Sequence, residues 1–323
     1  MSSVLQSQVT CPLCEGHAHQ LIERVKYADI RYVYRSVFKV SIPSEAADFI
    51  DYMRCLDCDV RFFTPAMCGP PQFYEQLQRL PWYYLPEKRE YQIAQRFVGA
   101  DSSVLEIGCG AGNFHEFLPK GCHYRGLEFN DLAISKARDR GLLVERLTVE
   151  DLAQSEHSSF DLVCAFQVLE HVEFPGRFLK AAVRLVKPGG MLAISVPSED
   201  SLMAYTPNNV LNTPPHHVTR WSDDALKSIC RIAHIGMLHL EHEELSAVNF
   251  KGFSRAQLFR TLERHLGLRL PLVSRAAATL PIRAVIHLMA KPIEWGYRVS
   301  KRLPVGHAVV AVYQRTPTPI AGG

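Results

Sequence analysis

Residues 104–112 read Val-Leu-Glu-Ile-Gly-Cys-Gly-Ala-Gly, an apolar strand that runs into three glycines at alternate positions. Glycine has no Cβ and adopts positive φ angles freely, so a Gly-x-Gly-x-Gly turn lets the backbone lie directly against a ligand. A strand, a glycine turn and a following helix occur in the sites of several nucleotide-type cofactors. The stretch therefore predicts an α/β fold with a cofactor loop, and it leaves the cofactor open.

Apolar strand patterns and helical periodicities alternate around this loop. The expected strands are 103–107, 124–129, 143–146, 161–166, 191–196, 237–243 and 308–314. The expected helices are 131–140, 174–186 and 223–233, and Lys187 to Gly190 reads as a helix stop and turn. Such alternation is typical of a doubly wound sheet. We therefore predict an α/β fold with a seven-stranded sheet.

Three ordered motifs narrow the choice of cofactor. Glu106 to Gly112 resembles motif I of class I S-adenosylmethionine-dependent methyltransferases, whereas a dinucleotide loop has the spacing Gly-x-Gly-x-x-Gly. Residues 160–172 and 185–190 resemble the fourth- and fifth-strand signatures of that family. The resemblance covers about residues 85–245 and the last strand. It implies a Rossmann-like sheet, S-adenosylmethionine as cofactor and methyl transfer as the reaction.

The resemblance also implies which residues contact the cofactor. Glu128 ends the second strand, where a carboxylate accepts both ribose hydroxyls. Residues 148–152 resemble the adenine-flanking segment of ubiquinone-biosynthesis O-methyltransferases, with Thr148 where many members have Asp. The expected cofactor-binding residues are Glu106, Gly108, Gly110, Gly112, Glu128, Phe129, Val149, Glu150, Phe166 and Gln167.

Histidines after the fourth and fifth strands are the candidate catalytic residues. Methyl transfer is an in-line displacement, so the protein must orient the acceptor and remove the proton of a hydroxyl or amine. His171 follows the fourth strand, where it could equally fix the loop or contact the cofactor. His216 and His217 follow two prolines, in a stretch that resembles those of bacterial methyltransferases acting on sugars and glycans. Relatives that bind a metal near His171 have an acid in the place of Gln167, which argues against an active-site metal here.

Four of the nine cysteines form two Cys-x-x-Cys pairs, Cys11 with Cys14 and Cys55 with Cys58. No secretory signal precedes them, and in an intracellular chain this spacing favours metal binding over disulfides. Two such turns offer the four thiolates of a closed structural zinc site, with a redox dithiol as the alternative. Similar N-terminal ribbons occur on bacterial sugar and small-molecule methyltransferases. Residues 25–40, rich in β-branched and aromatic side chains, read as an inserted hairpin.

Charge is unevenly distributed along this chain of 323 residues, whose composition is that of an ordinary globular protein. The net charge is +3, yet residues 251–304 carry eleven Lys and Arg against Glu263 and Glu294. A solvated basic face, an anionic membrane surface and nucleic acid are all compatible with such a segment. Nucleic acid is disfavoured, because no series of aromatic residues accompanies the cations. Residues 276–290 are too short and too polar to span a bilayer.

These observations divide the chain into four parts. They are a zinc-ribbon-like module with four cysteines (1–70), a linker with a lead-in helix (71–100), the cofactor-binding methyltransferase domain (101–244 and 304–316) and a basic helical insertion (245–303). Within the insertion, Pro292 should break or kink a helix. The prediction is a cytoplasmic enzyme, peripheral to the inner face of a membrane, that O-methylates a sugar, glycan or lipid-linked intermediate in polysaccharide biosynthesis. RNA or nucleobase methylation, sugar C-methylation and a non-catalytic S-adenosylmethionine-binding regulator are the alternatives.

Overall fold

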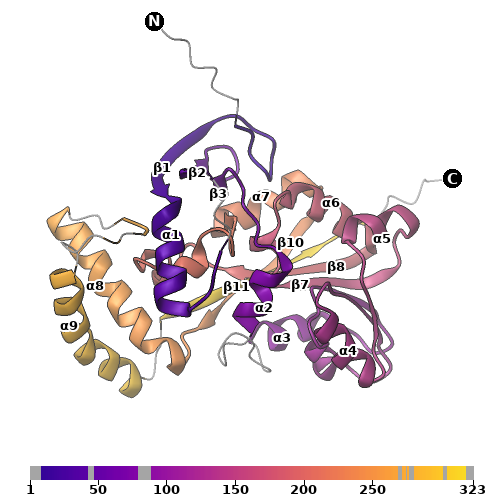
Figure 1. Ribbon diagram of the computed structural model, residues 1–323. Helices are drawn as coiled ribbons and strands as arrows, with labels where there is room; N and C mark the ends of the chain where they lie inside the picture. Colours follow the sequence, from indigo (N-terminus) through magenta and orange to yellow (C-terminus); the bar gives the residue numbers. More distant parts are fainter. Residues whose placement is uncertain are drawn as a thin grey trace, which may run out of the picture. The chain divides into compact units, whose positions relative to one another are not determined.

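A computed structural model describes residues 9–42, 47–78, 89–267, 271–273, 275, 280–300 and 304–317. The chain divides into two compact units, each built from separate segments of sequence (Figure 1). Unit 1 comprises Met1–Leu77, Ser198–Asp224 and Glu244–His307. Unit 2 comprises Gln78–Pro197, Ala225–Glu243 and Ala308–Gly323. The cysteine pairs and most of the basic segment, which lie far apart in the sequence, thus fall in the same unit.

A seven-stranded sheet forms the centre of unit 2, in the order β10-β11-β8-β7-β4-β5-β6. Its strands are β4 (Ser103–Ile107), β5 (His123–Leu127), β6 (Leu143–Glu145), β7 (Phe160–Phe166), β8 (Val186–Pro197), β10 (Gly236–Glu244) and β11 (Val305–Gln314). Strands β4 to β8 pair in parallel, and β11 pairs antiparallel with β8. The predicted seven-stranded α/β sheet is confirmed.

Helices accompany these strands. They are α3 (Arg89–Ala94), α4 (Asp131–Asp139), α5 (Val149–Ser155), α6 (Pro175–Leu185) and α7 (Asp223–Ala233). Helices α4, α6 and α7 correspond to the helices expected at 131–140, 174–186 and 223–233. Short 3₁₀ segments lie at Gln95–Phe97, Asn113–Phe117, Leu169–His171, Leu202–Tyr205, Val210–Asn212 and Ala247–Asn249. The chain leaves β4 toward β5 on one side and returns to β7 on the other, so the loop after β4 lies at a topological switch point, where ligands of such sheets bind.

The expected turn at Lys187 to Gly190 is only partly correct. Helix α6 does end at Leu185, but the four residues belong to β8. The amide of Gly189 donates to the carbonyl of Arg315 (2.9 Å), and Arg315 donates back to Gly190 (3.0 Å). Gly189 has φ +80°, which lets the strand start immediately after the helix.

A four-stranded antiparallel sheet belongs to unit 1, in the order β1-β2-β3-β9. Its strands are β1 (His19–Lys26), β2 (Phe49–Cys55), β3 (Arg61–Thr64) and β9 (Thr219–Arg220). The hairpin expected at residues 25–40 is wrong, because β1 is followed by α1 (Tyr27–Val33) and a π-helical turn (Tyr34–Phe38). Tyr27, Ile30 and Val33 are buried at a helical spacing of three, and this periodicity outweighed their β propensity.

The remaining helices of unit 1 are α2 (Pro71–Gln78), α8 (Phe250–Leu266) and α9 (Leu280–Val299). The break expected at Pro292 is absent, since α9 continues through it. The carbonyl of Leu288, which proline leaves without its helical donor, belongs to a residue that is 67% exposed, and water can therefore satisfy it. No helix in the described part of the chain is long and apolar enough to cross a membrane.

Candidate functional site

The glycine loop of unit 2 is held against the end of strand β5. The amides of Gly108 and Cys109 both donate to the carbonyl of Leu127, at 2.8 and 3.1 Å. Gly108, Gly110 and Gly112 have φ angles of +67°, +55° and +74°. Side chains with a Cβ rarely adopt such angles, which explains the alternate glycines.

The three glycines meet different surroundings. A Cβ on Gly108 would lie 2.5 Å from Val168, and one on Gly112 would lie 2.4 Å from Leu142. A Cβ on Gly110 would meet nothing within 4 Å. Gly108 and Gly112 are thus required by packing of the protein itself, whereas Gly110 borders space that a ligand can enter.

Glu128 joins the loop to the end of β5. Its Oε2 accepts a hydrogen bond from the Gly110 amide (2.8 Å), and its Oε1 accepts from the amides of Phe129 (2.8 Å) and Asn130 (2.9 Å). A carboxylate has about four acceptor positions, so these three donors leave capacity for a hydroxyl group. The side chain of Phe129 is exposed.

Glu106 lies on β4, two residues before the loop's first glycine, and is 1% exposed. Its Oε2 accepts a hydrogen bond from the Tyr124 hydroxyl. Burial, together with the charge of Glu106, raises the pKa of Tyr124 and of the Cys109 thiol, so both side chains stay protonated. The hydrogen bond therefore ties Glu106 of β4 to Tyr124 of β5, just before the loop begins.

Thr148 begins helix α5 as its N-cap. Its Oγ1 accepts from the Asp151 amide at 3.0 Å and donates to the Asp151 carboxylate at 2.7 Å. A Thr-x-x-acid pattern is a helix-start signal that the sequence could have supplied. The next two residues, Val149 and Glu150, form the first turn of α5, with Val149 buried and Glu150 half-buried.

Gln167 follows β7 in a left-handed conformation, with φ +58°. Its amide donates to the Ser195 carbonyl (2.8 Å), and its Nε2 donates to the Ser195 hydroxyl (3.0 Å). Positive φ at a residue with a side chain is a strain that clusters at functional sites. The sequence reasoning missed Ser195, which lies on β8. Phe166 is 4% exposed and packs edge-on against Tyr91 and Phe114, so its ring belongs to the core.

His171 lies in the same unit, at the end of a 3₁₀ segment. Its Nε2 is 3.9 Å from Oε1 of Glu170, a carboxylate that is 1% exposed. The imidazole itself is half-buried. His171 therefore adjoins a buried acid, an arrangement that fits either a structural or a proton-transfer role.

His216 and His217 belong to unit 1, just before β9. Their rings stack, with centroids 4.4 Å apart and planes 21° from parallel. Nδ1 of His216 lies 2.9 Å from the carbonyl oxygen of Leu211, and Nδ1 of His217 lies 3.0 Å from Oδ1 of Asn212. Both partner atoms can only accept, so each Nδ1 carries a hydrogen and each Nε2 is the proton-accepting nitrogen. Both histidines are 6% exposed.

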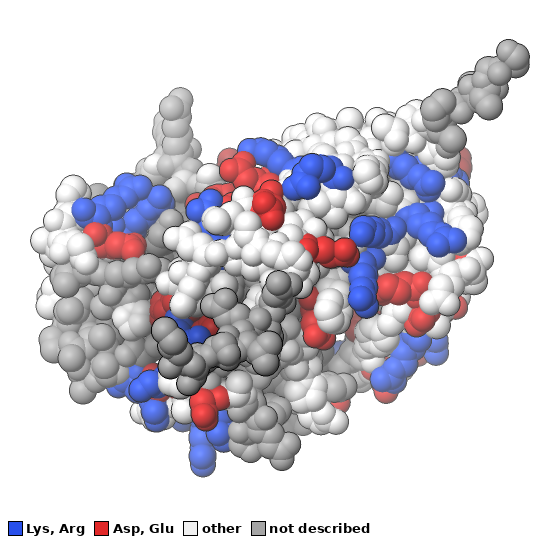
Figure 2. Space-filling view, turned by 90° about the horizontal axis from the view of Figure 1, so that it is seen from above, with Lys and Arg blue, Asp and Glu red and all other residues white. Residues whose placement is uncertain are grey.

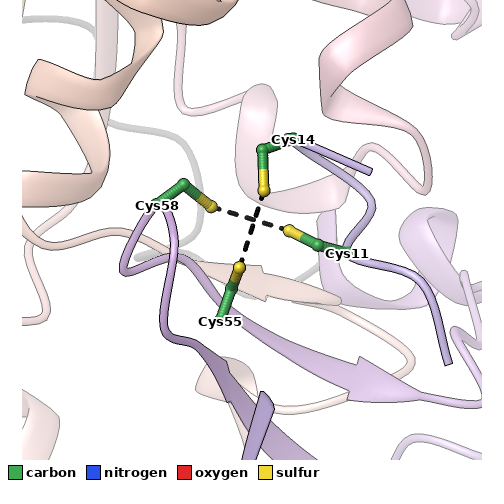
Figure 3. A group of neighbouring side chains, drawn as sticks. All are labelled: Cys11, Cys14, Cys55 and Cys58. Carbon is green, nitrogen blue, oxygen red and sulfur yellow. Dashed lines mark hydrogen bonds between the residues drawn. The ribbon is translucent and has the colours of Figure 1, made fainter. Parts of the chain in front are cut away.

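The four predicted cysteines of unit 1 converge on one point (Figure 3). The Sγ atoms of Cys11 and Cys58 are 3.6 Å apart, as are those of Cys14 and Cys55, and all four lie within 4.8 Å of one another. A disulfide requires about 2.05 Å, whereas sulfurs around a tetrahedral zinc with bonds of about 2.3 Å are about 3.8 Å apart. The cluster therefore fits a tetrahedral metal ion.

The two Cys-x-x-Cys turns have the same backbone geometry. The amide of Glu15 donates to the Cys11 carbonyl (3.0 Å), and that of Asp59 donates to the Cys55 carbonyl (3.1 Å). Glu15 and Asp59 both have φ +63°. The hydrogen bond between the Cys11 and Cys58 thiols lowers the pKa of Cys11 and raises that of Cys58, so Cys11 is the sulfur of this pair that more readily becomes a thiolate.

Comparison with known proteins identifies one domain. The family model described as a methyltransferase domain matches residues 78–234. The ubiquinone biosynthesis O-methyltransferase of Hahella chejuensis is 37% identical over 110 residues, which cover 32% of this chain and 46% of that protein. The protein of the same name from Alkalilimnicola ehrlichii is 35% identical over 118 residues, which cover 34% and 47%. The chain thus spans about half the length of the curated relatives it matches.

Two solved structures are similar over a larger part of the chain. A SAM dependent methyltransferase from Archaeoglobus fulgidus has a TM-score of 0.48 and 18% identity, and the match covers 75% of this chain and 99% of that one. A putative sarcosine dimethylglycine methyltransferase from Galdieria sulphuraria has a TM-score of 0.44 and 12% identity, with coverages of 71% and 83%.

Proposed function

We propose that the chain is an S-adenosylmethionine-dependent methyltransferase that transfers a methyl group to a hydroxyl oxygen of a sugar, glycan or lipid-linked acceptor. The match of residues 78–234 to a methyltransferase domain supports this proposal. The observation that carries the proposal is the loop after β4, where the open side of Gly110 adjoins the Glu128 carboxylate. Backbone open to a ligand, beside a carboxylate that accepts hydroxyls, suits a nucleoside cofactor. The O-methyltransferase names of the relatives support oxygen as the acceptor atom.

In this proposal the cofactor supplies an electrophilic methyl group, and the chain's own residues bind and orient it. Gly108, Gly110 and Gly112 shape the loop, and Glu106 lies just before it on β4. Glu128 accepts a ribose hydroxyl in the position that its three amide donors leave open, with Phe129 beside it. The first turn of α5, Val149 and Glu150, flanks the adenine, and residues 166–167 form the end of β7 next to the cofactor.

The proton of the acceptor hydroxyl passes to a histidine in this proposal. The Nδ1 contacts of His216 and His217 support them as bases, because both leave Nε2 as the accepting nitrogen. His171, beside the buried Glu170, is the alternative base.

Surface charge bears on the alternative of RNA methylation. On the face drawn in Figure 2, the cationic and anionic side chains of described residues are interspersed, without a large area of one sign. A continuous basic face is the expected footprint of a nucleic-acid-binding protein. The face drawn in Figure 2 therefore lacks, over its described residues, the footprint expected for RNA.

We expect Gly110→Ala to weaken cofactor binding by at least about tenfold, because the added Cβ enters the space of the ligand. Gly141→Ala is the matched control, since Gly141 also has a positive φ (+79°) and also has nothing within 4 Å, but lies on the turn after α4. Titration calorimetry with S-adenosylhomocysteine measures both affinities. Equal affinities in the two variants would show that the cofactor does not approach Gly110.

The same pair of variants tests the reaction. Wild-type and Gly141→Ala protein should transfer the isotope-labelled methyl group of S-adenosylmethionine to a hydroxylated molecule in fractionated lysate. At sub-saturating cofactor, Gly110→Ala should transfer it at least about tenfold more slowly. Mass spectrometry of the labelled fraction identifies the acceptor and the methylated atom. A labelled carbon, nitrogen or RNA, or no labelled fraction at all, contradicts O-methylation of a sugar.

We also propose that the four-cysteine cluster holds a structural Zn²⁺. The four-sulfur donor set and the sulfur separations support a closed tetrahedral site without an open position for substrate. In this role the ion joins the first turn, before β1, to the second turn, between β2 and β3. Its contribution is to the stability of unit 1 rather than to chemistry.

We propose that helix α9 brings the protein to an anionic membrane surface. One stripe of the helix carries Val285, Leu288, Pro292, Trp295 and Val299, at alternating spacings of three and four, and its four large apolar side chains are 55–67% exposed. Ile286 and Ala290, on another face, are buried. Monomeric proteins rarely expose an apolar stripe of this length, and a tryptophan within a cationic segment is typical of interfacial helices.

Vesicle binding tests this surface. The double variant Leu288→Glu with Trp295→Glu should bind phosphatidylethanolamine–phosphatidylglycerol vesicles at least about tenfold more weakly, since each inserted apolar side chain contributes about 1.5 kcal/mol or more. Leu132→Glu, at a residue of α4 that is 64% exposed, is the control and should bind normally. Co-sedimentation measures the binding. Equal binding to neutral phosphatidylcholine vesicles, or dimerisation through α9 in light scattering, would contradict the proposal.

A further inference from the structure

Unit 1 contains a cavity of about 350 Å³, at the lower end of the size range of small-molecule sites. Strands β1, β2, β3 and β9, helix α8 and residues 199–207 and 271–272 contribute to its lining. None of the residues predicted from the sequence as catalytic, cofactor-binding or metal-binding lines it. It is therefore separate from the cofactor loop and from the cysteine cluster.

A network of charged side chains forms one wall of this cavity, with Arg220 buried and Glu199 and Arg61 half-buried. Arg220, which is 5% exposed, donates from Nε to Oε2 of Glu199 at 2.6 Å. The Tyr52 hydroxyl donates to Oε1 of the same carboxylate at 3.0 Å, and Nε of Arg61 lies 3.6 Å from it. Burial raises the pKa of Tyr52, which keeps the hydroxyl protonated and donating.

Such a network is a costly way to stabilise a fold. Taking charged side chains even partly out of water has a desolvation cost, and well-packed apolar side chains often serve stability better. Segments far apart in the sequence nevertheless place three charged side chains together at the cavity wall. A ligand that needs these groups accounts for the arrangement.

The balance of charge indicates which ligand fits. The charged residues that line the cavity are Arg54, Arg61, Arg220, Glu23, Glu199 and Glu263, three of each sign. Guanidinium groups only donate hydrogen bonds and carboxylates only accept them, whereas a hydroxyl group does both and can bridge the two. An anion would face the three carboxylates and a cation the three guanidinium groups. The lining therefore matches a neutral molecule with several hydroxyls.

Apolar side chains complete the lining. Leu21 and Ile22 come from β1, and Phe259 and Leu262 come from α8. The wall beside β1 is fixed by the Leu272 amide, which donates to Glu23 at 2.9 Å. A sugar ring has both kinds of surface, hydroxyls at its edge and C–H groups on its faces.

We propose that this cavity binds a neutral, polyhydroxylated ligand of about one sugar ring, held by the Glu199, Arg220 and Arg61 network and covered by Phe259. The identification of this ligand as part of the methyl acceptor rests on the proposed function. The binding itself does not.

Saturation-transfer NMR on the full chain, without methyl donor, tests the cavity. The probes are methyl glycosides of neutral hexoses and 6-deoxyhexoses, with a glucuronide and a glucosaminide as charged counterparts. We expect saturation transfer to at least one neutral glycoside and at least tenfold weaker binding of the charged pair. Phe259→Ala should weaken binding at least tenfold, whereas Leu258→Ala, beside it on α8 but outside the lining, should not.

Three results would overturn the proposal: no transfer to any neutral glycoside, tighter binding of a charged one, or equal effects of the Phe259 and Leu258 variants. Parallel titration with S-adenosylhomocysteine separates this outcome from the proposed function. Sugar binding without methyl transfer leaves the cavity assigned and removes the reaction. If the protein transfers methyl groups to a molecule without a sugar and binds no glycoside, the methyltransferase reaction is retained and the assignment of the cavity is removed.

Discussion

Cys11→Ser and Cys58→Ser are each expected to remove bound zinc and to unfold the small sheet of unit 1. The cluster joins a turn that precedes β1 to the turn between β2 and β3, so the loss of one sulfur opens both connections. Structural zinc contributes about 10 kcal/mol or more to folding in zinc-finger peptides, comparable with the total stability of a typical domain. We therefore expect a loss of several kcal/mol in the free energy of unfolding.

Metal analysis and tryptophan fluorescence measure this effect together. Trp221 is fully buried, and its Nε1 donates to Thr219 of β9, so its emission should shift to the red when the sheet unfolds. The control is Cys68→Ser, because Cys68 is an exposed cysteine of the same unit outside the cluster. It should retain about one equivalent of zinc and the wild-type emission. A folded wild-type protein with less than half an equivalent of zinc would rule out the structural role.

The sheet of unit 2 could be predicted because its signals are local. Strand β4 has the bounds that the apolar run 103–107 indicates, and α7 has those expected from residues 223–233. The loop after β4 could also be predicted from the sequence, because each of its three glycines has a positive φ angle in the structure. Each of these features depends on residues within one turn or one strand of each other.

The errors arose where two local signals competed. Residues 27–33 have strand-forming composition but helical periodicity. They form a helix because Tyr27, Ile30 and Val33, at a spacing of three, are buried together on one face. Pro292 was expected to break or kink α9, and the helix does not break there, because the solvent-facing position of Leu288 makes the lost hydrogen bond inexpensive. Composition alone could settle neither case, because burial determined both.

The wall of the cavity in unit 1 could not be predicted at all. Tyr52 and Glu199 are 147 positions apart in the sequence, and Arg220 lies on a two-residue strand that no periodicity reveals. Each of these residue types is common in proteins and gives no signal alone, and only the fold brings the three side chains together. The same holds for Ser195, which supports Gln167 from the neighbouring strand.

His216→Gln and His217→Gln are expected to show which of the two histidines is the general base and which one positions it. Removal of a general base lowers turnover by about 10²–10⁴, whereas the loss of a positioning partner costs about tenfold. The stacked rings, 4.4 Å apart, imply that one histidine holds the other. Affinity for S-adenosylhomocysteine should stay within about twofold of wild type in both variants, since neither histidine is among the expected cofactor contacts. His265→Gln, at an exposed histidine of α8, should leave turnover unchanged.

The pH dependence of turnover distinguishes the two roles. A base must be neutral to accept the acceptor's proton, so wild-type turnover should fall toward acid pH. The variant that lacks the base should lose this dependence along with the rate, and the variant that lacks the support should keep it with a shifted midpoint. Both Nδ1 atoms donate to fixed oxygens. A glutamine retains the volume of the histidine side chain, but it supplies no nitrogen base. Wild-type turnover and an unchanged pH profile in both variants would exclude this pair and leave His171 as the base, which His171→Gln would then identify by the same loss.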